Sequence, residues 1–248
     1  MNIIISPAKK MRVDLDSFPV EAVPPFMDRT EALLARLREL SEEELKALWK
    51  CSDALVELNQ ERLRTMDIHR NLTPAILSYE GIQYQYMAPN VFDETALRYV
   101  QEHLRILSGF YGVVRPFDGV TPYRLEMQAK LPMEGCKDLY GYWGSALADH
   151  LTGETDCILN LASKEYSVCV SRYLPESVRF ITCVFGERKG GKIIEKGTLC
   201  KMARGDMVRY LAQSGAETPE AVQGYDGLGF RFSAEDSDPS TFTFIKEE

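Results

Sequence analysis

Hydrophobic positions along this chain recur with two different spacings. Short apolar runs bounded by glycine, proline or polar residues predict strands at 2–6, 72–79, 105–114, 157–161 and 178–185. Apolar residues three or four positions apart predict helices at 28–40, 41–49, 52–63, 93–103, 139–151 and 197–212. Strands and helices alternate through most of the chain, which favours a mixed α/β or α+β arrangement. We predict an α+β fold built on a single compact mixed sheet.

Turn signals and shorter runs complete this outline. The stretch GERKGGK at 186–192 joins an apolar run to two isoleucines, which indicates a hairpin. Apolar runs at 229–232 and 241–246 predict a terminal strand pair. No repeat or low-complexity linker interrupts the chain, so we predict one domain over 1–248. The helices at about 28–71 form a candidate helical insert within it.

The insert contains a predicted helical hairpin. Ser41 precedes three glutamates, a capping box that starts one helix, and Ser52 starts the next. The turn at Lys50, Cys51 and Ser52 resembles that of a helix-hairpin-helix, a module whose turn amides bind DNA phosphates. It lacks the glycines usual in such turns, and residues 41–70 include five basic and seven acidic side chains. An ordinary helical hairpin is therefore a rival interpretation.

Composition places the chain among folded globular proteins, with 45% hydrophobic and 27% charged residues. The formal net charge of -8 argues against a polyanionic partner for the chain as a whole. The charge is segregated, however. Residues 217–248 include eight acids and two bases, whereas residues 187–216 include seven bases and three acids. The basic segments can therefore meet an anion even though the whole chain is acidic.

Cysteine and histidine usage narrows the chemistry. The six cysteines are scattered and form no CxxC pair, which favours free thiols in a reducing cytoplasm. The three histidines lie far apart and outside any HExxH or Cys/His cluster, so we expect no metal site and no cofactor. The stretch MNIIISPAKKMR has too short an apolar run for a secretory signal or a membrane span. We expect a cytoplasmic protein.

Two arginines in LSGFYGVVRPFDGVTPYRLEM, residues 107–127, are candidates for binding an anion. Arg115 and Arg124 lie close to prolines that restrict the backbone, and a guanidinium can hold phosphate or carboxylate through two hydrogen bonds. The alternative is surface pairing of Arg115 with Asp118 and of Arg124 with Glu126, which contributes little to stability. Locally, these two interpretations are equally open.

Basic residues also follow predicted strands elsewhere. Lys9 and Lys10 lie on the loop after the first strand, and Lys164 follows the strand at 157–161. Ser163 lacks the SxxK spacing and the glycine pattern of a serine nucleophile, which favours a role as a helix cap. Solvated strand ends are the alternative account of the three lysines.

The basic helix at 197–212 offers further cations. Lys201 lies at a spacing that places it near Arg204 or Arg209 on one helix face. A solvated charged face is the simplest interpretation, and a wall facing an anion is the alternative.

Four sequence blocks together resemble the YaaA family of bacterial peroxide-stress proteins. They are ISPAKKM, ILSGFYGVVRPFDGVTPYRLEM, ILNLASKEY and KMARGDMVRY, which occur in the family's order over nearly the whole chain. The resemblance implies a cytoplasmic bacterial protein that responds to hydrogen peroxide and is linked to low intracellular free iron. It also implies a single fold of unusual topology with a helix-hairpin-helix and a positively charged cleft.

The same resemblance implies binding of duplex or branched DNA, mainly independent of base sequence. The residues that match family motifs, and that we expect in one cleft, are Lys9, Lys10, Arg115, Arg124, Lys164, Lys201 and Arg204. The hairpin turn departs from the glycine-containing motif, so we expect the cleft to supply most phosphate contacts. No iron ligand set is visible, so we expect any effect on iron to be indirect.

Three functional hypotheses follow. The first is a DNA-binding stress protein, without an assigned catalytic activity, that protects DNA where peroxide and iron together would damage it. The second is an enzyme acting on a small anionic or phosphorylated substrate, with Arg115 and Arg124 holding it and Lys164 or Tyr166 transferring protons. The third is an interaction protein whose acidic tail, 217–248, contacts a partner or competes for the cleft, although solubility is the simpler account of the tail.

The geometry of the basic residues separates the first two hypotheses. A closed pocket that holds them together favours the enzyme, and an open groove favours DNA binding. The oligomeric state is left open, with a monomer as the starting assumption.

Overall fold

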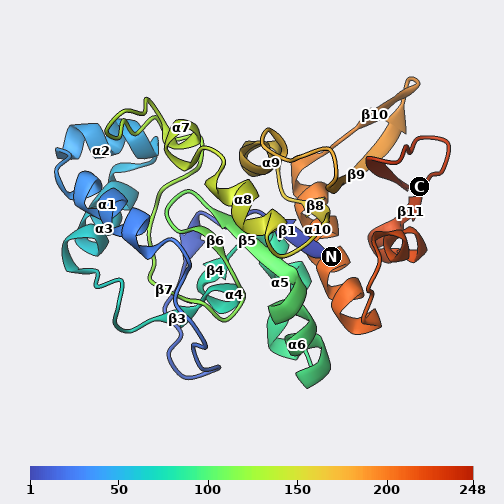
Figure 1. Ribbon diagram of the computed structural model, residues 1–248, viewed down its shortest axis with the longest axis horizontal. Coiled ribbons are helices and arrows are strands. Elements are labelled where there is room, and N and C mark those ends of the chain that lie inside the picture. Colours follow the sequence, from blue (N-terminus) through green and yellow to red (C-terminus); the bar gives the residue numbers. More distant parts are fainter. Residues whose placement is uncertain (248) are drawn as a thin grey trace.

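An eight-stranded, mostly parallel sheet forms the centre of the computed structural model, which describes residues 1–247 (Figure 1). Its strand order is β11-β12-β9-β8-β1-β5-β6, and β10 pairs with β9 outside this path. The parallel strands are β1 (Asn2–Ile5), β5 (Leu104–Ser108), β8 (Cys157–Leu161), β9 (Arg179–Lys189) and β12 (Thr241–Lys246). The antiparallel strands are β6 (Gly112–Val114), β10 (Lys192–Ile194) and β11 (Phe230–Phe232).

Four very short strands form two further pairs. β2 (Lys10–Met11) pairs with β4 (Tyr79–Glu80), and β3 (Thr73–Pro74) pairs with β7 (Gly119–Val120). The prediction of one domain with a mixed sheet and helices is confirmed, and the sheet is predominantly parallel.

Helices surround this sheet (Figure 1). They are α1 (Met27–Arg38), α2 (Glu42–Trp49), α3 (Asp53–Thr65), α4 (Ala75–Ser78), α5 (Ile82–Met87), α6 (Glu94–His103), α7 (Leu139–Trp143), α8 (Ala146–Thr152), α9 (Lys164–Ser171) and α10 (Gly197–Ser214). Short 3-10 turns occur at Pro89–Val91, Pro219–Gly224 and Gly227–Gly229. Within residues 1–247, no helix combines the length and the apolar character that crossing a membrane requires.

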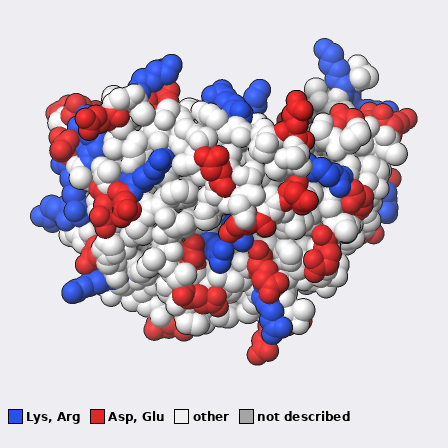
Figure 2. Space-filling view, viewed as in Figure 1, with Lys and Arg blue, Asp and Glu red and all other residues white. Residues whose placement is uncertain are grey.

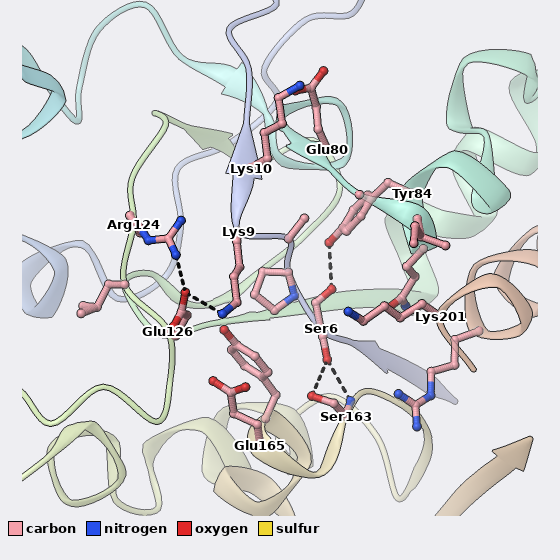
Figure 3. Close-up of a pocket in the computed structure, with 18 of the residues that line it drawn as sticks. Ser6, Lys9, Lys10, Glu80, Tyr84, Arg124, Glu126, Ser163, Glu165 and Lys201 are labelled. Atoms are coloured by element: carbon pink, nitrogen blue, oxygen red, sulfur yellow. Dashed lines mark hydrogen bonds and ion pairs between the residues drawn. The ribbon is translucent and has the colours of Figure 1, made fainter. Parts of the chain in front are cut away.

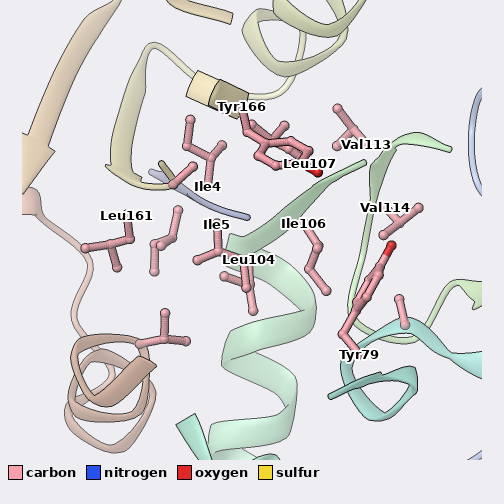
Figure 4. Close-up of a cluster of buried hydrophobic side chains, with 14 of the residues drawn as sticks. Ile4, Ile5, Tyr79, Leu104, Ile106, Leu107, Val113, Val114, Leu161 and Tyr166 are labelled. Atoms are coloured by element: carbon pink, nitrogen blue, oxygen red, sulfur yellow. The ribbon is translucent and has the colours of Figure 1, made fainter. Parts of the chain in front are cut away.

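The interior strand β1 explains the unbroken run of isoleucines near the N-terminus. Ile3, Ile4 and Ile5 are completely buried, because β1 lies between β5 and β8 and both of its faces are covered. Figure 4 shows Ile5, Leu104 and Leu161 from these three strands packed in one cluster. A strand buried on both faces needs apolar side chains at every position, not at alternate ones.

The order of the strands reverses at β1. The chain passes from β1 to its neighbour β5 and then outward to β6, before it returns to β8 on the other side of β1 and continues outward to β9. In open sheets of this kind, ligands bind beyond the carboxyl ends of the strands at such a reversal. The loops after β1 and β8 therefore lie where this topology places a ligand.

Three sequence predictions need correction. Residues 72–79 are not one strand: after β3 the chain turns into the buried helix α4, because a short, mostly apolar run suits a buried helical turn as well as a strand. Residues 105–114 are two strands joined by a tight turn, β5 and β6. Residues 139–151 are two helices, because Gly144 adopts a positive φ of 49° between them.

The capping box predicted at Ser41 is present, whereas the side chain of Ser52 makes no capping hydrogen bond. Ser41 and Glu44 form the capping box that begins α2, and α3 begins after Ser52. Lys50 ends α2 in the left-handed conformation, a position that glycine commonly occupies. Figure 1 shows α1, α2 and α3 at one end of the molecule, far from β9 and β10.

Candidate functional site

A cavity of about 420 Å³ lies at the carboxyl ends of β1 and β8, where the strand order reverses (Figure 3). Its lining comes from segments far apart in sequence: the loop after β1, the start of α5, the loop before α7, the start of α9, and α10. The charged residues that line it are Lys9, Lys10, Glu80, Arg124, Glu126, Glu165, Lys201 and Arg204. Cations outnumber carboxylates, which favours an anionic ligand.

Two serines join the loops that follow β1 and β8. The Ser163 amide donates to Ser6 Oγ at 2.8 Å, and the two hydroxyls lie 3.1 Å apart. Tyr84 from α5 donates its hydroxyl to the Ser6 carbonyl at 3.0 Å. Ser163 precedes α9 as predicted, but its side chain accepts no hydrogen bond from the first-turn amides of α9. These amides therefore have no side-chain cap from Ser163.

One side of the cavity is an ion-paired cluster. Glu126 Oε1 lies 3.1 Å from Lys9 Nζ and 3.3 Å from an Arg124 guanidinium nitrogen (Figure 3). The predicted pairing of Arg124 with Glu126 is therefore present, although not at the surface, because the Arg124 side chain is only 10% exposed. Lys10 pairs separately with Glu80 at 2.9 Å. The cations on this side already face carboxylates.

The α10 side of the cavity lacks such close partners. The carboxylate nearest Arg204 is that of Glu195 at 3.7 Å, although the Arg204 side chain is only 14% exposed. Lys201 forms no ion pair within residues 1–247, and Figure 3 shows its side chain extending toward Ser6. Both cations therefore retain unused hydrogen-bond donors.

Helix packing places these two cations. A Cβ on Gly205 would come within 2.0 Å of the Gln83 carbonyl oxygen, so α10 crosses α5 at a distance that only glycine permits. This close contact brings the first half of α10 against the start of α5. The RG pair in KMARGDMVRY thus joins a cavity-lining arginine to the residue that positions it.

Four buried polar atoms in the lining have no hydrogen-bond partner within residues 1–247. They are the donors Arg124 Nε, Arg204 Nε and Gln83 Nε2 and the acceptor Glu126 Oε1, whose ion-pair contacts lack hydrogen-bond geometry. An unpaired buried donor costs roughly 1–3 kcal/mol, and such groups are rare in native proteins. Donors that converge on one cavity indicate a ligand with hydrogen-bond acceptors, such as the oxygens of a phosphate or carboxylate.

Glu165 is a titratable group that the sequence interpretation passed over in favour of its neighbour Lys164. Burial raises the pKa of the Glu165 carboxyl, although the Gln128 amide donates to it at 3.3 Å. Burial likewise raises the pKa of Tyr166 well above its ordinary value. The signal that could have identified Glu165 is its place in the first helical turn after β8, at the reversal of the strand order.

Other predicted residues lie away from the cavity. Arg115 is at the opposite end of the sheet, where its guanidinium pairs with Glu154 at 2.8 Å and its backbone amide donates to Asp118. Lys164 is exposed and does not line the cavity. The hairpin residues Lys50, Cys51 and Ser52 lie in the turn between α2 and α3 and do not line it either.

The surface around these elements is mixed in charge. Figure 2 shows basic and acidic side chains interspersed over the face it presents. Among residues 1–247, no three His, Cys, Asp or Glu side chains are close enough together to hold a metal ion. The chemistry that the cavity offers is recognition of an anion by Lys and Arg, beside the half-buried carboxyl of Glu165, which can exchange a proton.

Comparisons with known proteins identify the family of the chain. A family model described as "Peroxide stress protein YaaA" matches residues 1–236. The chain is similar to a UPF0246 protein of Lachnoclostridium phytofermentans, with 56% identity over 248 residues that cover 100% of this chain and 97% of the relative. A UPF0246 protein of Agathobacter rectalis is 50% identical over 247 residues, covering 100% of this chain and 99% of the relative. The chain belongs to the YaaA family of peroxide stress proteins.

Proposed function

We propose that this protein acts in the bacterial response to hydrogen peroxide by binding a phosphorylated small molecule in the cavity at the carboxyl ends of β1 and β8. One observation carries the proposal: Arg124 and Arg204 both line the cavity and are nearly buried, and each keeps an unpaired Nε donor. A buried guanidinium without a full set of acceptors is costly, and the acceptor oxygens of a bound phosphorylated molecule remove that cost.

The size of the cavity supports a small ligand over a duplex. Its volume of about 420 Å³ falls in the range of small-molecule sites. A DNA duplex, in contrast, presents its phosphates on the outside and meets proteins along extended basic surfaces. The converging side chains therefore favour the small anionic ligand among our functional hypotheses, and Glu165 gives the site a group able to transfer protons.

Calorimetric titration tests this proposal. The probes are inorganic phosphate, pyrophosphate and ribose 5-phosphate, with free ribose as the uncharged control. We expect at least one phosphorylated probe to bind and ribose alone to show no measurable heat. If none of the phosphorylated probes binds or raises the melting temperature, the proposal is wrong.

DNA binding that limits iron-dependent oxidative damage in the cytoplasm is a second proposal. It is supported by the exposed side chains of Lys9 and Lys10 beside the cavity, which can reach phosphates outside it, and by the family's description as a peroxide stress protein. The formal net charge of -8 restricts such binding to this local surface.

Fluorescence anisotropy with a labelled duplex tests the second proposal. Binding is expected to weaken steeply as salt rises, because neutralising phosphates releases counterions. Lys10→Gln should weaken binding, whereas Lys192→Gln on the distant β9–β10 hairpin is the matched control. Equal effects of the two substitutions, or no binding at low salt, would exclude the cavity rim as a DNA site.

A further inference from the structure

The charges that line the cavity are unevenly distributed. On the side of Lys9 and Arg124, two carboxylates, Glu126 and Glu165, accompany the two cations. On the α10 side, the cations are Lys201, which extends toward Ser6, and Arg204. Among residues 1–247 the only carboxylate paired with them is Glu195 at 3.7 Å, which is not among the lining residues. The cavity thus has a charge-balanced half and a half with excess positive charge.

Additional donors belong to the positive half. Ser163 contributes a hydroxyl, to which Ser6 Oγ donates at 3.1 Å, and α9 begins immediately after Ser163 without a side-chain cap on its first amides. Gln83, on the α5 segment that α10 crosses, is only 7% exposed and its Nε2 has no partner within residues 1–247. A helix N-terminus, hydroxyls and two cations are the groups that hold phosphate in many proteins.

We propose that the phosphate of the ligand is held between the start of α9 and the Lys201–Arg204 side of α10, and that the half containing Glu126 and Glu165 receives a hydroxyl-bearing body. The proposal rests on the proposed function, because it divides the same cavity into two subsites. Its ligand class is a phosphate ester of a polyol, whose hydroxyls donate to carboxylates and accept from Lys9 and Arg124.

The physical reason for this orientation is the cost of displacing existing partners. A phosphate placed beside Lys9 and Arg124 would have to compete with Glu126, which already lies 3.1 and 3.3 Å from them, and would be repelled by it. A phosphate beside Arg204 displaces only a distant contact and satisfies an unpaired donor. Neutral hydroxyls, in contrast, fit between paired charges without repulsion.

Calorimetry with inorganic phosphate and ribose 5-phosphate tests the two subsites on the full chain. Arg204→Met keeps the apolar stem of the side chain and should weaken phosphate binding about tenfold or more. Lys201→Gln should weaken it in the same direction. Lys9→Gln, the matched cation of the opposite half, should change inorganic phosphate affinity by less than about threefold. Melting temperatures establish that each variant is folded, and Arg204→Lys should restore part of the affinity.

The second subsite has its own readout. Ribose 5-phosphate should bind about tenfold more tightly than inorganic phosphate, and Glu165→Gln should reduce that advantage without changing affinity for inorganic phosphate. If phosphate binds but Lys9→Gln weakens it more than Arg204→Met does, the orientation is wrong while the proposed function stands. If no phosphorylated probe binds the unmodified chain, both the proposed function and this inference fail.

Discussion

The two ends of the parallel sheet carry similar charged residues in opposite states of pairing. At the amino end, Glu154 accepts hydrogen bonds from Arg105, Arg115 and Asn2 at 2.8, 2.8 and 2.9 Å. At the carboxyl end, Arg204 has a single carboxylate at 3.7 Å and an unpaired Nε. The side chains of Arg105 and Arg204 are both largely buried.

This contrast separates charges that stabilise the fold from charges that await a ligand. At the amino end, burial opposes ionisation of Glu154, but hydrogen bonds from Arg105 and Arg115 prevail and hold its pKa at about 2. At the carboxyl end, the protein itself supplies too few acceptors. Sites that bind ligands are often less stable than the rest of a fold for this reason, so stability and binding should respond differently to substitution at the two ends.

The largest expected effect on stability comes from breaking the amino-end cluster. Glu154→Gln removes the charge that faces Arg105, whose side chain is only 4% exposed, and should lower the free energy of unfolding by about 3 kcal/mol. Urea denaturation at pH 7 measures this loss. Affinity of the cavity for phosphate should stay unchanged.

The pH dependence of that loss follows from the pKa of Glu154. The folded-state value of about 2 lies below the ordinary value of 4.5, so the stabilisation is fully present above pH 4.5 and is lost as the pH falls toward 2. The difference between the native chain and the variant should shrink over that range. Glu176→Gln, at an exposed position, is the matched control. A similar loss in both variants would mean that Glu154 has no special role.

The pKa of Asp118, at the same end of the sheet, is shifted in the opposite direction, so its contribution to stability should have the opposite pH dependence. Burial raises its pKa from 3.8 to about 6, even though the Arg115 amide donates to it at 2.8 Å. The folded state therefore binds a proton more tightly than the unfolded state does, and stability falls as the pH rises from about 4 to 6. Asp118→Asn should raise the free energy of unfolding at pH 7 by about 2 kcal/mol and flatten this slope. Urea midpoints between pH 4 and 7 check both effects, and an unchanged slope would contradict the assignment.

The smallest change in stability is expected at the carboxyl end. Arg204→Met removes an unpaired buried donor while it keeps an apolar side chain of similar length, so the free energy of unfolding should rise by about 1 kcal/mol. Thermal and urea denaturation without ligand measure it. Destabilisation comparable to that of Glu154→Gln would show that Arg204 serves the fold, and the contrast between the two ends would disappear.

The segment 107–127 shows what could be predicted from the sequence and what could not. The sequence pattern identified Arg115 and Arg124 as a pair of anion-binding candidates. In the structure, however, β6 runs antiparallel to β5 and carries the chain back to the amino end of the sheet before Arg115. The chain then returns, and Tyr123 donates to or accepts from Ser108 at the end of β5, 2.6 Å away. Arg115 and Arg124 are thus nine positions apart in sequence but lie at opposite ends of the sheet.

Gly109 is the residue at which the returning chain passes close to the end of β5. A Cβ there would lie 2.6 Å from the Leu125 carbonyl oxygen, so this glycine allows the returning chain to approach β5 closely. The approach brings Arg124 and Glu126 to the cavity. Sequence inspection found the glycine and the arginine, but not the contact that connects them.

The sequence by itself identified the family to which the chain belongs, and it determined the local elements: the buried isoleucine strand, the capping box at Ser41 and the basic helix that became α10. These depend on neighbours within a few positions, where side-chain size, periodicity and capping act directly. Only the tertiary structure decided which cations meet. Whether a charge is paired depends on strand direction and on helix contacts between segments far apart in sequence, as at Gly205 against Gln83.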